Sequence, residues 1–289
     1  MNERVPPAEK MQIPPAIIFS DLDGTLLDHA DYTFGPALPA LRAIQQAGIP
    51  LILTTSKTLA ETAEINRALG NHQAVIVENG GALCFPLDQA LAFEIGAGEM
   101  LHGHAVVRLA PPHEWVRRFI ERQRARHRWR LRGFGDMTNS EVVEQTGLSE
   151  AAAELARQRL CGEPFVWLDS PERFAQFRDA AADHGLGVTR GGRFHHLTGH
   201  ANKADAMRRL LRATYPAYPH PVIALGDSDN DKAMLEAADV AVVIRRPDGT
   251  HLDCHGTQRT LLTRQEGPTG WNAAVLQVLD ELRVHTPAT

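Results

Sequence analysis

Short apolar runs and amphipathic stretches alternate along the first part of the chain. Apolar runs at residues 16–19, 49–53 and 74–77 predict strands that are buried on both faces, as in a parallel sheet. Residues 38–47 and 59–69, which lie between these runs, have the apolar spacing of helices. Each of the three predicted strands ends in polar residues, as strands do beside a ligand site.

The same alternation returns towards the C-terminus. Residues 203–213 predict a helix, and residues 222–225 and 240–244 predict two further strands, the second of which we expect to be the last. In a doubly wound sheet, ligands bind outside the carboxyl ends of the strands, where this sequence places its polar residues. The pattern therefore predicts an α/β fold with a Rossmann-like, doubly wound parallel-sheet core.

The middle of the chain, from about residue 86 to residue 196, has a mixed pattern. It predicts two strands, at residues 105–109 and 165–168. It also predicts three helices, at residues 113–126, about 148–160, and 171–184. Mixed elements between the two halves of a parallel sheet indicate an inserted α+β unit. We predict a core domain of residues 1–86 and 197–289 and an inserted domain of residues 87–196.

The composition is that of an ordinary globular protein. Of the 289 residues, 43% are apolar and 22% are charged. A net charge of −5 and a pI near 6.3 argue against general nucleic-acid binding. A local run of alternating arginines from Arg122 to Arg132 indicates a solvated face, with attraction of an anionic substrate as the alternative.

The cysteines and the apolar windows bear on the compartment. Cys84, Cys161 and Cys254 show no C-x-x-C spacing and are too few for a disulfide framework, which fits a reducing cytoplasm. Residues 1–15 are polar and proline-rich without an apolar signal core, and no later window is long and apolar enough to span a bilayer. We expect a soluble cytoplasmic protein with neither a membrane nor a nucleic acid as partner.

The segment D-L-D-G-T at residues 21–25 directly follows the first predicted strand. Asp21 and Asp23 point to the same face of the strand, so both can reach one Mg²⁺ ion and one phosphate. Asp21 suits a nucleophile that becomes an aspartyl-phosphate, and Asp23 suits the acid/base that protonates the leaving oxygen and then activates water. The alternatives are a turn followed by a helix N-cap and the metal clamp of a glycosyltransferase.

Two further segments carry candidate phosphate ligands. Thr55 ends the second strand, where its hydroxyl can bind a transferring phosphate, and Ser56 can bind the substrate or simply cap the next helix. Lys203 opens a helix after the inserted block, where its charge would offset the repulsion between phosphate and Asp21. A solvated lysine at a helix end is the alternative.

The segment G-D-S-D-N-D at residues 226–231 ends another strand. A helix beginning near Ser228 would bring the carboxylates of Asp227 and Asp231 to one metal ion, with Asn230 on the phosphate side. An EF-hand calcium loop does not fit, because Lys232 stands where that loop needs glycine and Ala238 where it needs glutamate.

Taken in order, D-L-D-G-T, Thr55, Lys203 and G-D-S-D-N-D resemble the four motifs of the haloacid dehalogenase-like phosphatases. The insertion between the second and third motifs resembles the cap of the Cof-type sugar phosphatases, which closes over the core and selects the substrate. The resemblance implies that Mg²⁺ is held by Asp21, Asp227, Asp231 and the backbone carbonyl of Asp23.

Five further segments resemble one group of that family, the mannosyl-3-phosphoglycerate phosphatases. They are T-T-S-K-T at 54–58, V-E-N-G-G at 77–81, E-P-F-V-W at 163–167, G-G-R-F-H-H-L at 191–197 and G-P-T-G-W-N at 267–272. The resemblance implies a Mg²⁺-dependent phosphatase that releases mannosylglycerate, a compatible solute. Gly162 departs from the group's pattern, in which a serine is expected. Rival hypotheses are a phosphatase of glucosyl-3-phosphoglycerate or another sugar phosphate, a phosphomutase, and a non-catalytic phosphate-responsive binding module.

A phosphorylated sugar-glycerate substrate needs a cation for its carboxylate and several partners for its hydroxyl groups. We expect Arg193 to bind the carboxylate, and Glu163 either to bind sugar hydroxyls or to have a structural role. Glu78 and Asn79, at the end of a core strand, are expected to bind substrate as well. The pair His195-His196 lacks the four-ligand spacing of a transition-metal site.

Overall fold

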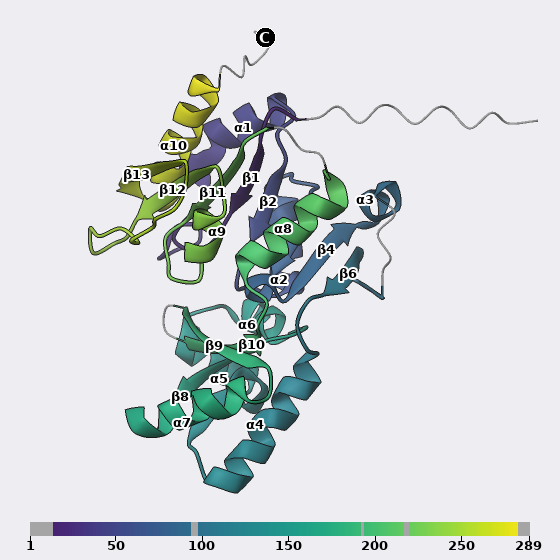
Figure 1. The fold of residues 1–289 in the computed structure, drawn as a ribbon, viewed down its shortest axis with the longest axis vertical. Coiled ribbons are helices and arrows are strands. Elements are labelled where there is room, and N and C mark those ends of the chain that lie inside the picture. The colour runs from purple at the N-terminus through teal and green to yellow at the C-terminus, as the bar shows by residue number, and fades with distance from the viewer. Residues whose placement is uncertain (1–13, 94–97, 192–193, 217–219, 283–289) are drawn as a thin grey trace, which may run out of the picture.

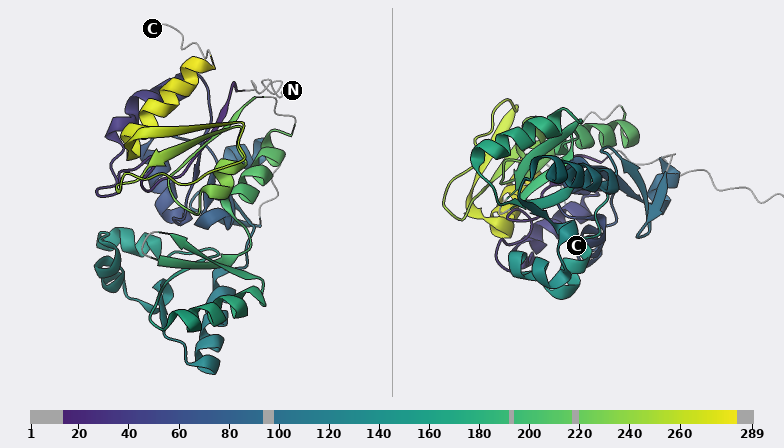
Figure 2. Two further views of the ribbon diagram at one scale, coloured as in Figure 1. Left: turned by 60° about the vertical axis from the view of Figure 1, so that its left-hand side comes forward. Right: turned by 90° about the horizontal axis from the view of Figure 1, so that it is seen from below.

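Two β-sheets organise the chain in the computed structural model, which describes residues 14–93, 98–191, 194–216 and 220–282. The larger sheet, with helices on both faces, forms one unit, and a smaller sheet with its own helices forms the other (Figures 1 and 2). The predicted α/β fold with a parallel-sheet core is confirmed. Within the described residues, no helix combines the length and apolar character needed to cross a membrane.

The larger sheet has the strand order β13-β12-β11-β1-β2-β3-β4-β6-β5. Its parallel part includes all five predicted core strands, which are β1 (Ile17–Ser20), β2 (Leu51–Thr54), β3 (Val75–Val77), β11 (Val222–Gly226) and β12 (Val240–Arg245). The expectation that the strand at 240–244 would be the last is wrong, because β13 (Arg259–Glu266) pairs parallel to β12. Its mixed, largely exposed side chains do not form an apolar run.

Three antiparallel strands extend the other edge of this sheet. They are β4 (Ala82–Pro86), β5 (Glu99–Leu101) and β6 (His104–Arg108). The last two, with α3 (Leu87–Ala92), lie inside residues 87–196, so strand pairing puts the end of the first core segment after residue 108 instead of residue 86. The predicted strand at 105–109 therefore exists, but it belongs to the core sheet.

Helices cover both faces of the larger sheet because side chains alternate between the faces along each strand. On one face, Ile18 and Leu53 pack with α1 (Leu38–Gln46), α2 (Leu59–Ala68) and α10 (Gly267–Glu281). On the other, Phe19 and Ile52 pack with α8 (Lys203–Thr214) and α9 (Lys232–Glu236). This two-sided burial explains why the core strands were recognisable as continuous apolar runs.

The smaller sheet has the order β7-β8-β10-β9 and is antiparallel throughout. Its strands are β7 (Leu131–Gly133), β8 (Glu163–Trp167), β9 (Leu186–Gly191) and β10 (Phe194–Gly199). One face packs on α4 (His113–His127) and α7 (Pro171–Ala182) through an aromatic core that includes Phe165 and Phe177. Since β10 runs to Gly199, the second boundary of this unit, the cap, falls after residue 199 instead of residue 196.

Two short helices lie in this region, of which the second confirms the helix expected at about residues 148–160 in a shorter form, and the first was not predicted. They are α5 (Asn139–Thr146) and α6 (Glu150–Ala156), separated by Gly147, which has a positive φ of 80°. Thr138 starts α5 with a capping box that involves Glu141, and Ser149 caps α6. Residues 157–162 lead back to the core, where Leu160 and Cys161 are buried.

The two connections between core and cap lie against each other. A Cβ atom at Gly199 would come within 2.7 Å of the Pro111 ring, so only glycine permits this close approach. Beyond the connection, a Cβ atom at Gly80 would lie 2.3 Å from the carbonyl oxygen of Asn202. Close backbone contact thus fixes the start of α8 against the end of β3.

Candidate active site

The carboxyl ends of three adjacent parallel strands bring the predicted core residues together. Asp21 follows β1, Thr55 follows β2 and Asp227 follows β11, and β1 pairs with both of the other strands. The chain turns directly after Asp21, where Gly24 has a φ of +75° and a Cβ atom on it would lie 3.0 Å from the Asp227 carboxylate. Glycine is therefore required both by the turn and by the neighbouring acid.

Three carboxylates form the centre of the site. Oxygen atoms of Asp21, Asp227 and Asp231 all lie within 4.8 Å of one another. Burial and the Asp231 charge raise the pKa of Asp21 well above its ordinary value, although Lys203 opposes the rise. Burial and Asp231 likewise raise the pKa of Asp227 to about 7, against the opposing hydrogen bond from Thr25. Such crowding of buried negative charge calls for a cation.

Lys203 supplies one positive charge to this cluster. Its Nζ atom lies 2.6 Å from Asp21 Oδ1 and 2.6 Å from Asp231 Oδ1, and its side chain is fully buried. Burial alone would lower the pKa of Lys203, but the two carboxylates raise it overall, so the amine stays protonated. The alternative of a solvated lysine at a helix end is therefore excluded.

Asp231 reaches the cluster through a turn and not through a helix that begins at Ser228. The helix α9 starts only at Lys232, and Asp231 Oδ2 accepts the backbone N–H groups of Asp227 (3.1 Å) and Ser228 (3.0 Å). The side chain thus closes the turn that the helix was expected to make. Its other oxygen faces Lys203.

The donor set fits a hard divalent cation. Mg²⁺ is bound in proteins by one or two carboxylates, with water and substrate phosphate completing its octahedron. Asp21, Asp227 and Asp231 offer three carboxylate oxygens, of which Asp231 is already engaged by Lys203 and two backbone amides. The Asp23 carboxylate is not part of this group. The predicted metal ligand at this residue is the backbone carbonyl, and that role stays a prediction.

Asp23 is instead paired with a residue that the sequence analysis did not single out. Lys57 Nζ lies 3.0 Å from Asp23 Oδ1 and 4.8 Å from the centre of the Tyr32 ring. Burial alone would lower the pKa of Lys57, but Asp23 and Glu61 raise it overall. A lysine directly after a polar strand end, within T-T-S-K-T, was a signal that could have identified it.

A cavity of about 440 Å³ lies over the cluster and is bounded by both units. Its core side includes Asp21, Asp23, Ser56, Lys57, Asp227 and Asn230. Its cap side includes Phe134, Arg159, Pro164, Phe194 and His196. The cap residues come from three separate segments. Substrate binding was predicted in two of them, at Glu163 and Arg193, but not for the residues named here.

Glu78 does not line this cavity, in contrast to the prediction. Its fully buried carboxylate accepts the backbone N–H groups of Leu160 (2.5 Å), Cys161 (2.9 Å) and Gly162 (2.6 Å). These bonds fasten the segment that returns from the cap, and they occupy the oxygens that would have met a substrate. Asn79, with φ +58°, accepts a hydrogen bond from Asn230 Nδ2 at 2.9 Å, so it touches the cavity through Asn230.

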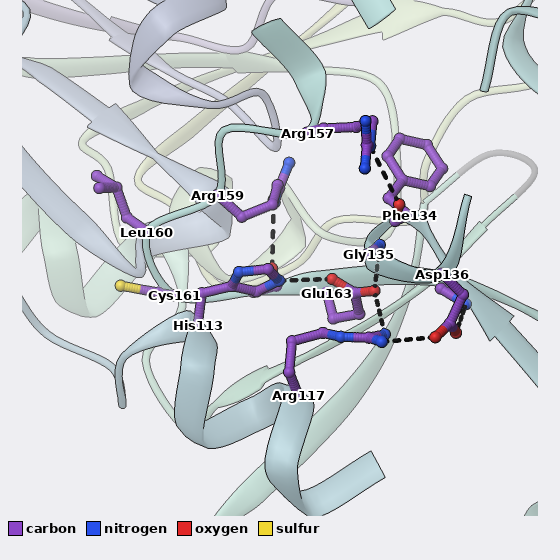
Figure 3. Close-up of polar contacts among 12 residues, drawn as sticks. His113, Arg117, Phe134, Gly135, Asp136, Arg157, Arg159, Leu160, Cys161 and Glu163 are labelled. Atoms are coloured by element: carbon purple, nitrogen blue, oxygen red, sulfur yellow. Dashed lines mark hydrogen bonds and ion pairs between the residues drawn. The ribbon is translucent and has the colours of Figure 1, made fainter. Parts of the chain in front are cut away.

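Glu163 has a structural role in this structure. One oxygen of its carboxylate accepts hydrogen bonds from Arg117 (2.9 Å) and from the Gly135 N–H (2.8 Å), and the other oxygen lies 2.6 Å from His113 Nε2 (Figure 3). The side chain is fully buried, and the next residue, Pro164, faces the cavity because strand side chains alternate. The alternative that Glu163 binds sugar hydroxyls is therefore not supported. Arg193 lies outside the described residues.

Comparison with known proteins identifies the family of this chain. Residues 18–92 and 173–247 match the profile of the haloacid dehalogenase-like hydrolases. A phosphatase of Persephonella marina, named glucosyl-3-phosphoglycerate/mannosyl-3-phosphoglycerate phosphatase, is 34% identical over 92% of this chain and 98% of its own. The chain belongs to the haloacid dehalogenase-like hydrolase family. The predicted class of enzyme, a phosphoric monoester hydrolase, is confirmed with it.

A second relative supports the assignment, and solved structures support the fold. A protein of Methanococcoides burtonii with the same name is 34% identical over 91% of this chain and 97% of its own. Among solved structures, a Thermoplasma acidophilum protein has a TM-score of 0.64 at 16% identity, covering 93% of this chain and 98% of that one. The sucrose-phosphatase of Synechocystis has a TM-score of 0.53 at 16% identity, with 93% and 98% covered. At these identities the structures support the fold alone.

Proposed function

We propose that this enzyme hydrolyses mannosyl-3-phosphoglycerate to mannosylglycerate and phosphate. The observation that supports the proposal most directly is the pairing of Lys203 with Asp21 under a cavity bounded by the cap. The names of the relatives from Persephonella marina and Methanococcoides burtonii support the substrate. Because those names include both sugars, glucosyl-3-phosphoglycerate is the second candidate substrate.

In the proposed mechanism, an Asp21 carboxylate oxygen attacks phosphorus. A bond forms between this oxygen and phosphorus, and the bond from phosphorus to the glycerate oxygen breaks. Asp23 gives its proton to the departing oxygen, which leaves an aspartyl-phosphate on Asp21. Asp23 then takes a proton from water, whose oxygen attacks phosphorus and releases phosphate and free Asp21. Thr55 would hold a phosphate oxygen during both steps.

Charge neutralisation is the main physical requirement of this mechanism. Lys203 stays protonated and lies 2.6 Å from Asp21, so it reduces the repulsion between the nucleophile and the phosphate. Mg²⁺, held by Asp21, Asp227 and Asp231, would supply the remaining positive charge when bound. Ser56 and Asn230, which line the cavity, are proposed to bind the substrate beside the phosphate.

A hydrolysis panel tests the proposal. Phosphate release is measured from mannosyl-3-phosphoglycerate, its glucosyl analogue, 3-phosphoglycerate and hexose phosphates, with Mg²⁺ or with a chelator. We expect the highest kcat/KM for the mannosyl compound, no turnover with chelator, and at least a 1,000-fold loss for Asp21→Asn, on the order of the losses seen when a nucleophile is removed. Preference for the glucosyl compound would select the second candidate substrate.

Three outcomes would each contradict a different part of the proposal. Near-normal turnover by Asp21→Asn would exclude the aspartyl-phosphate. Activity confined to hexose phosphates would leave the mechanism in place and reject both phosphoglycerate substrates. Transfer of phosphate within the substrate, without free phosphate, would indicate a phosphomutase.

A further inference from the structure

His196 is placed by strand alternation on the cavity side of the cap. It lies on β10 directly opposite Pro164 of β8, and both residues line the cavity. Its neighbour His195 points to the opposite face, where its ring lies 5.5 Å from that of Phe165 and 4.5 Å from that of Phe174. Two adjacent histidines of the same strand therefore meet different surroundings.

The imidazole of His196 has an unsatisfied polar atom. Only 8% of the residue is exposed, and among the described residues no hydrogen-bond partner is found for its buried Nδ1 atom. Buried polar atoms in proteins are nearly always paired, with protein, water or ligand. Nδ1 itself has almost no accessible surface, so a ligand in the cavity would reach this atom only after the ring turns, whereas the edge of the ring that lines the cavity can meet a ligand directly.

The imidazole is also neutral. Burial, with the nearby charges of Arg159 and Lys203 and the ring of His195, lowers the pKa of His196 to about 3. A neutral ring offers one donor and one acceptor and suits a hydroxyl group, whereas the carboxylate and phosphate of a substrate would favour the cations. Lys57, Arg159 and Lys203 provide these cations on other walls or beneath the cavity.

Apart from Arg159 and Thr146, the residues that line the cap side of the cavity with His196 are apolar. Phe134 and Phe194 meet edge to face, with ring centres 5.0 Å apart, and both line the cavity together with Pro164. A sugar ring presents apolar C–H groups on its faces and hydroxyl groups around its edge. Apolar walls with one or two placed polar groups are the usual form of a site for such a ligand.

We propose that His196 is a specificity-determining residue that binds a hydroxyl of the substrate's sugar, with Phe134, Phe194 and Pro164 against the ring. This inference rests on the proposed function, because it assigns the sugar half of that substrate to the cap. The phosphate then lies at Asp21, and the sugar lies on the far side of the cavity.

Replacing each histidine in turn tests the inference. His196→Phe removes both ring nitrogens and keeps an aromatic ring, and His195→Phe is the matched control on the opposite face. The measured quantities are kcat and KM for the sugar-phosphoglycerate, and the inhibition constant of 3-phosphoglycerate, which carries phosphate and carboxylate but no sugar. Circular dichroism and thermal unfolding check that each variant folds.

For His196→Phe we expect KM to rise about 10- to 100-fold, the loss typical of a buried hydrogen bond, with kcat changed less than about 3-fold. The inhibition constant of 3-phosphoglycerate should change less than about 3-fold, and His195→Phe should change neither constant more than that. His196→Gln, which keeps a donor and an acceptor, should recover part of the affinity.

Two results would overturn the inference while the proposed function stood. One is a KM for His196→Phe no higher than that for His195→Phe. The other is an equal rise in KM and in the inhibition constant, which would place His196 at the phosphate or carboxylate. Failure of the unmodified enzyme to hydrolyse either sugar-phosphoglycerate would instead reject the proposed function.

Discussion

Burial lowers the pKa of both Lys203 and His196, but their neighbours leave the first charged and the second neutral. Lys203 keeps its proton because the carboxylates of Asp21 and Asp231 are each 2.6 Å away. His196 has cations and no carboxylate among the groups that act on it, so burial and repulsion favour the neutral ring. The charge of each residue follows from its neighbours more than from its own type.

The neutral state of His196 predicts how stability depends on pH. Its pKa is about 3 in the folded protein, below the usual 6.5, so the unfolded chain binds more protons between these values. Stability contributed by neutral His196 is therefore present above about pH 6.5 and is lost as the pH falls. From pH 7 to pH 5 we expect a loss of about 1–2 kcal/mol from this residue alone.

Urea unfolding of the unmodified protein and of His196→Phe at pH 7 and pH 5 measures this contribution. The variant should lose less stability than the unmodified protein over this interval, by the amount given above. The groups whose charges act on His196, namely Arg159, His195 and Lys203, are the same in both proteins. Equal losses in both proteins would show that His196 is already protonated at pH 5.

Among the elements, α2 and α5 begin with the same kind of capping box but differ in one contact. Thr58 caps α2 with Glu61, and Thr138 caps α5 with Glu141. Thr58 Oγ1 also lies 2.9 Å from the carbonyl oxygen of Leu155, at the end of α6 in the cap. The N-terminus of α2 thus stabilises the contact between the units as well as its own helix.

Threonine-to-alanine substitution at the two caps tests this difference. Loss of an N-cap typically costs about 1 kcal/mol, which we expect for Thr138→Ala. Thr58→Ala should cost about 1 kcal/mol more, because the hydrogen bond between the two units is lost as well. Denaturant unfolding measures both free energies. A smaller cost for Thr58→Ala than for Thr138→Ala would mean that the bond to Leu155 contributes nothing.

The Glu163 cluster holds an element of the cavity wall. Two glycines lie closely against this cluster. A Cβ atom on Gly133 would lie 2.1 Å from Glu163 Oε1, and one on Gly135 would lie 2.7 Å from Arg117 Nε. Phe134, between these glycines, is directed into the cavity. Arg117 and Arg124 also bind Asp136 and hold its pKa below the usual range, although burial alone would raise it.

Glu163→Gln should therefore destabilise the cap and loosen Phe134. We expect a loss of about 2–4 kcal/mol in unfolding free energy, since Arg117 would keep a buried charge without its full complement. KM should rise several-fold with a smaller change in kcat. Glu141→Gln, which alters an exposed ion pair with Arg132 in the same cap, is the matched control and should leave KM unchanged. Unchanged KM for Glu163→Gln would separate the cluster from substrate binding.

The sequence predicted the elements whose apolar pattern is set by two-sided burial. All five parallel core strands at apolar runs were found, because a strand covered on both faces must be apolar throughout. Strands β5 and β7, of three residues each, and the exposed edge strand β13 have no such pattern, so their pairing depends on partners distant in the sequence.

For the whole molecule, the core side of the candidate site could be predicted from the sequence, whereas the cap side could not. Asp21, Thr55 and Asp227 could be predicted because parallel strands bring their carboxyl ends to one edge of the sheet. Phe134, Arg159 and His196 meet only when three segments of the cap fold over the core, and local spacing does not encode that arrangement. Glu78 was misread as a substrate ligand, and the role of Glu163 stayed open, because in sequence a carboxylate that organises the surrounding chain resembles one that binds a ligand.

The acidic cluster affects the stability of the whole molecule through protons and metal. The pKa of Asp227 is raised to about 7 by burial and by Asp231, so the folded state holds this proton more tightly than the unfolded chain does. In the absence of a divalent cation, stability is therefore lost as the pH rises from about 4 to about 7. A bound cation competes with the proton, and its stabilising effect should grow over the same interval.

Asp227→Asn should remove the contribution of this residue to the dependence of stability on pH and on divalent cation. At pH 8 without divalent cation, we expect the variant to unfold at a higher temperature than the unmodified protein, because one repelling charge is gone and Thr25 can still donate to the amide oxygen. Addition of Mg²⁺ should raise the unfolding temperature of the unmodified protein and have little effect on the variant. Asp229→Asn, in the same loop but with a 79% exposed side chain, is the control and should keep the Mg²⁺ response.

If Asp227→Asn without metal unfolded at a lower temperature than the unmodified protein, the Asp227 carboxylate would be stabilising by itself, and the cluster would not need a cation to fold. Because unfolding is measured without substrate, the result bears on the metal site independently of turnover.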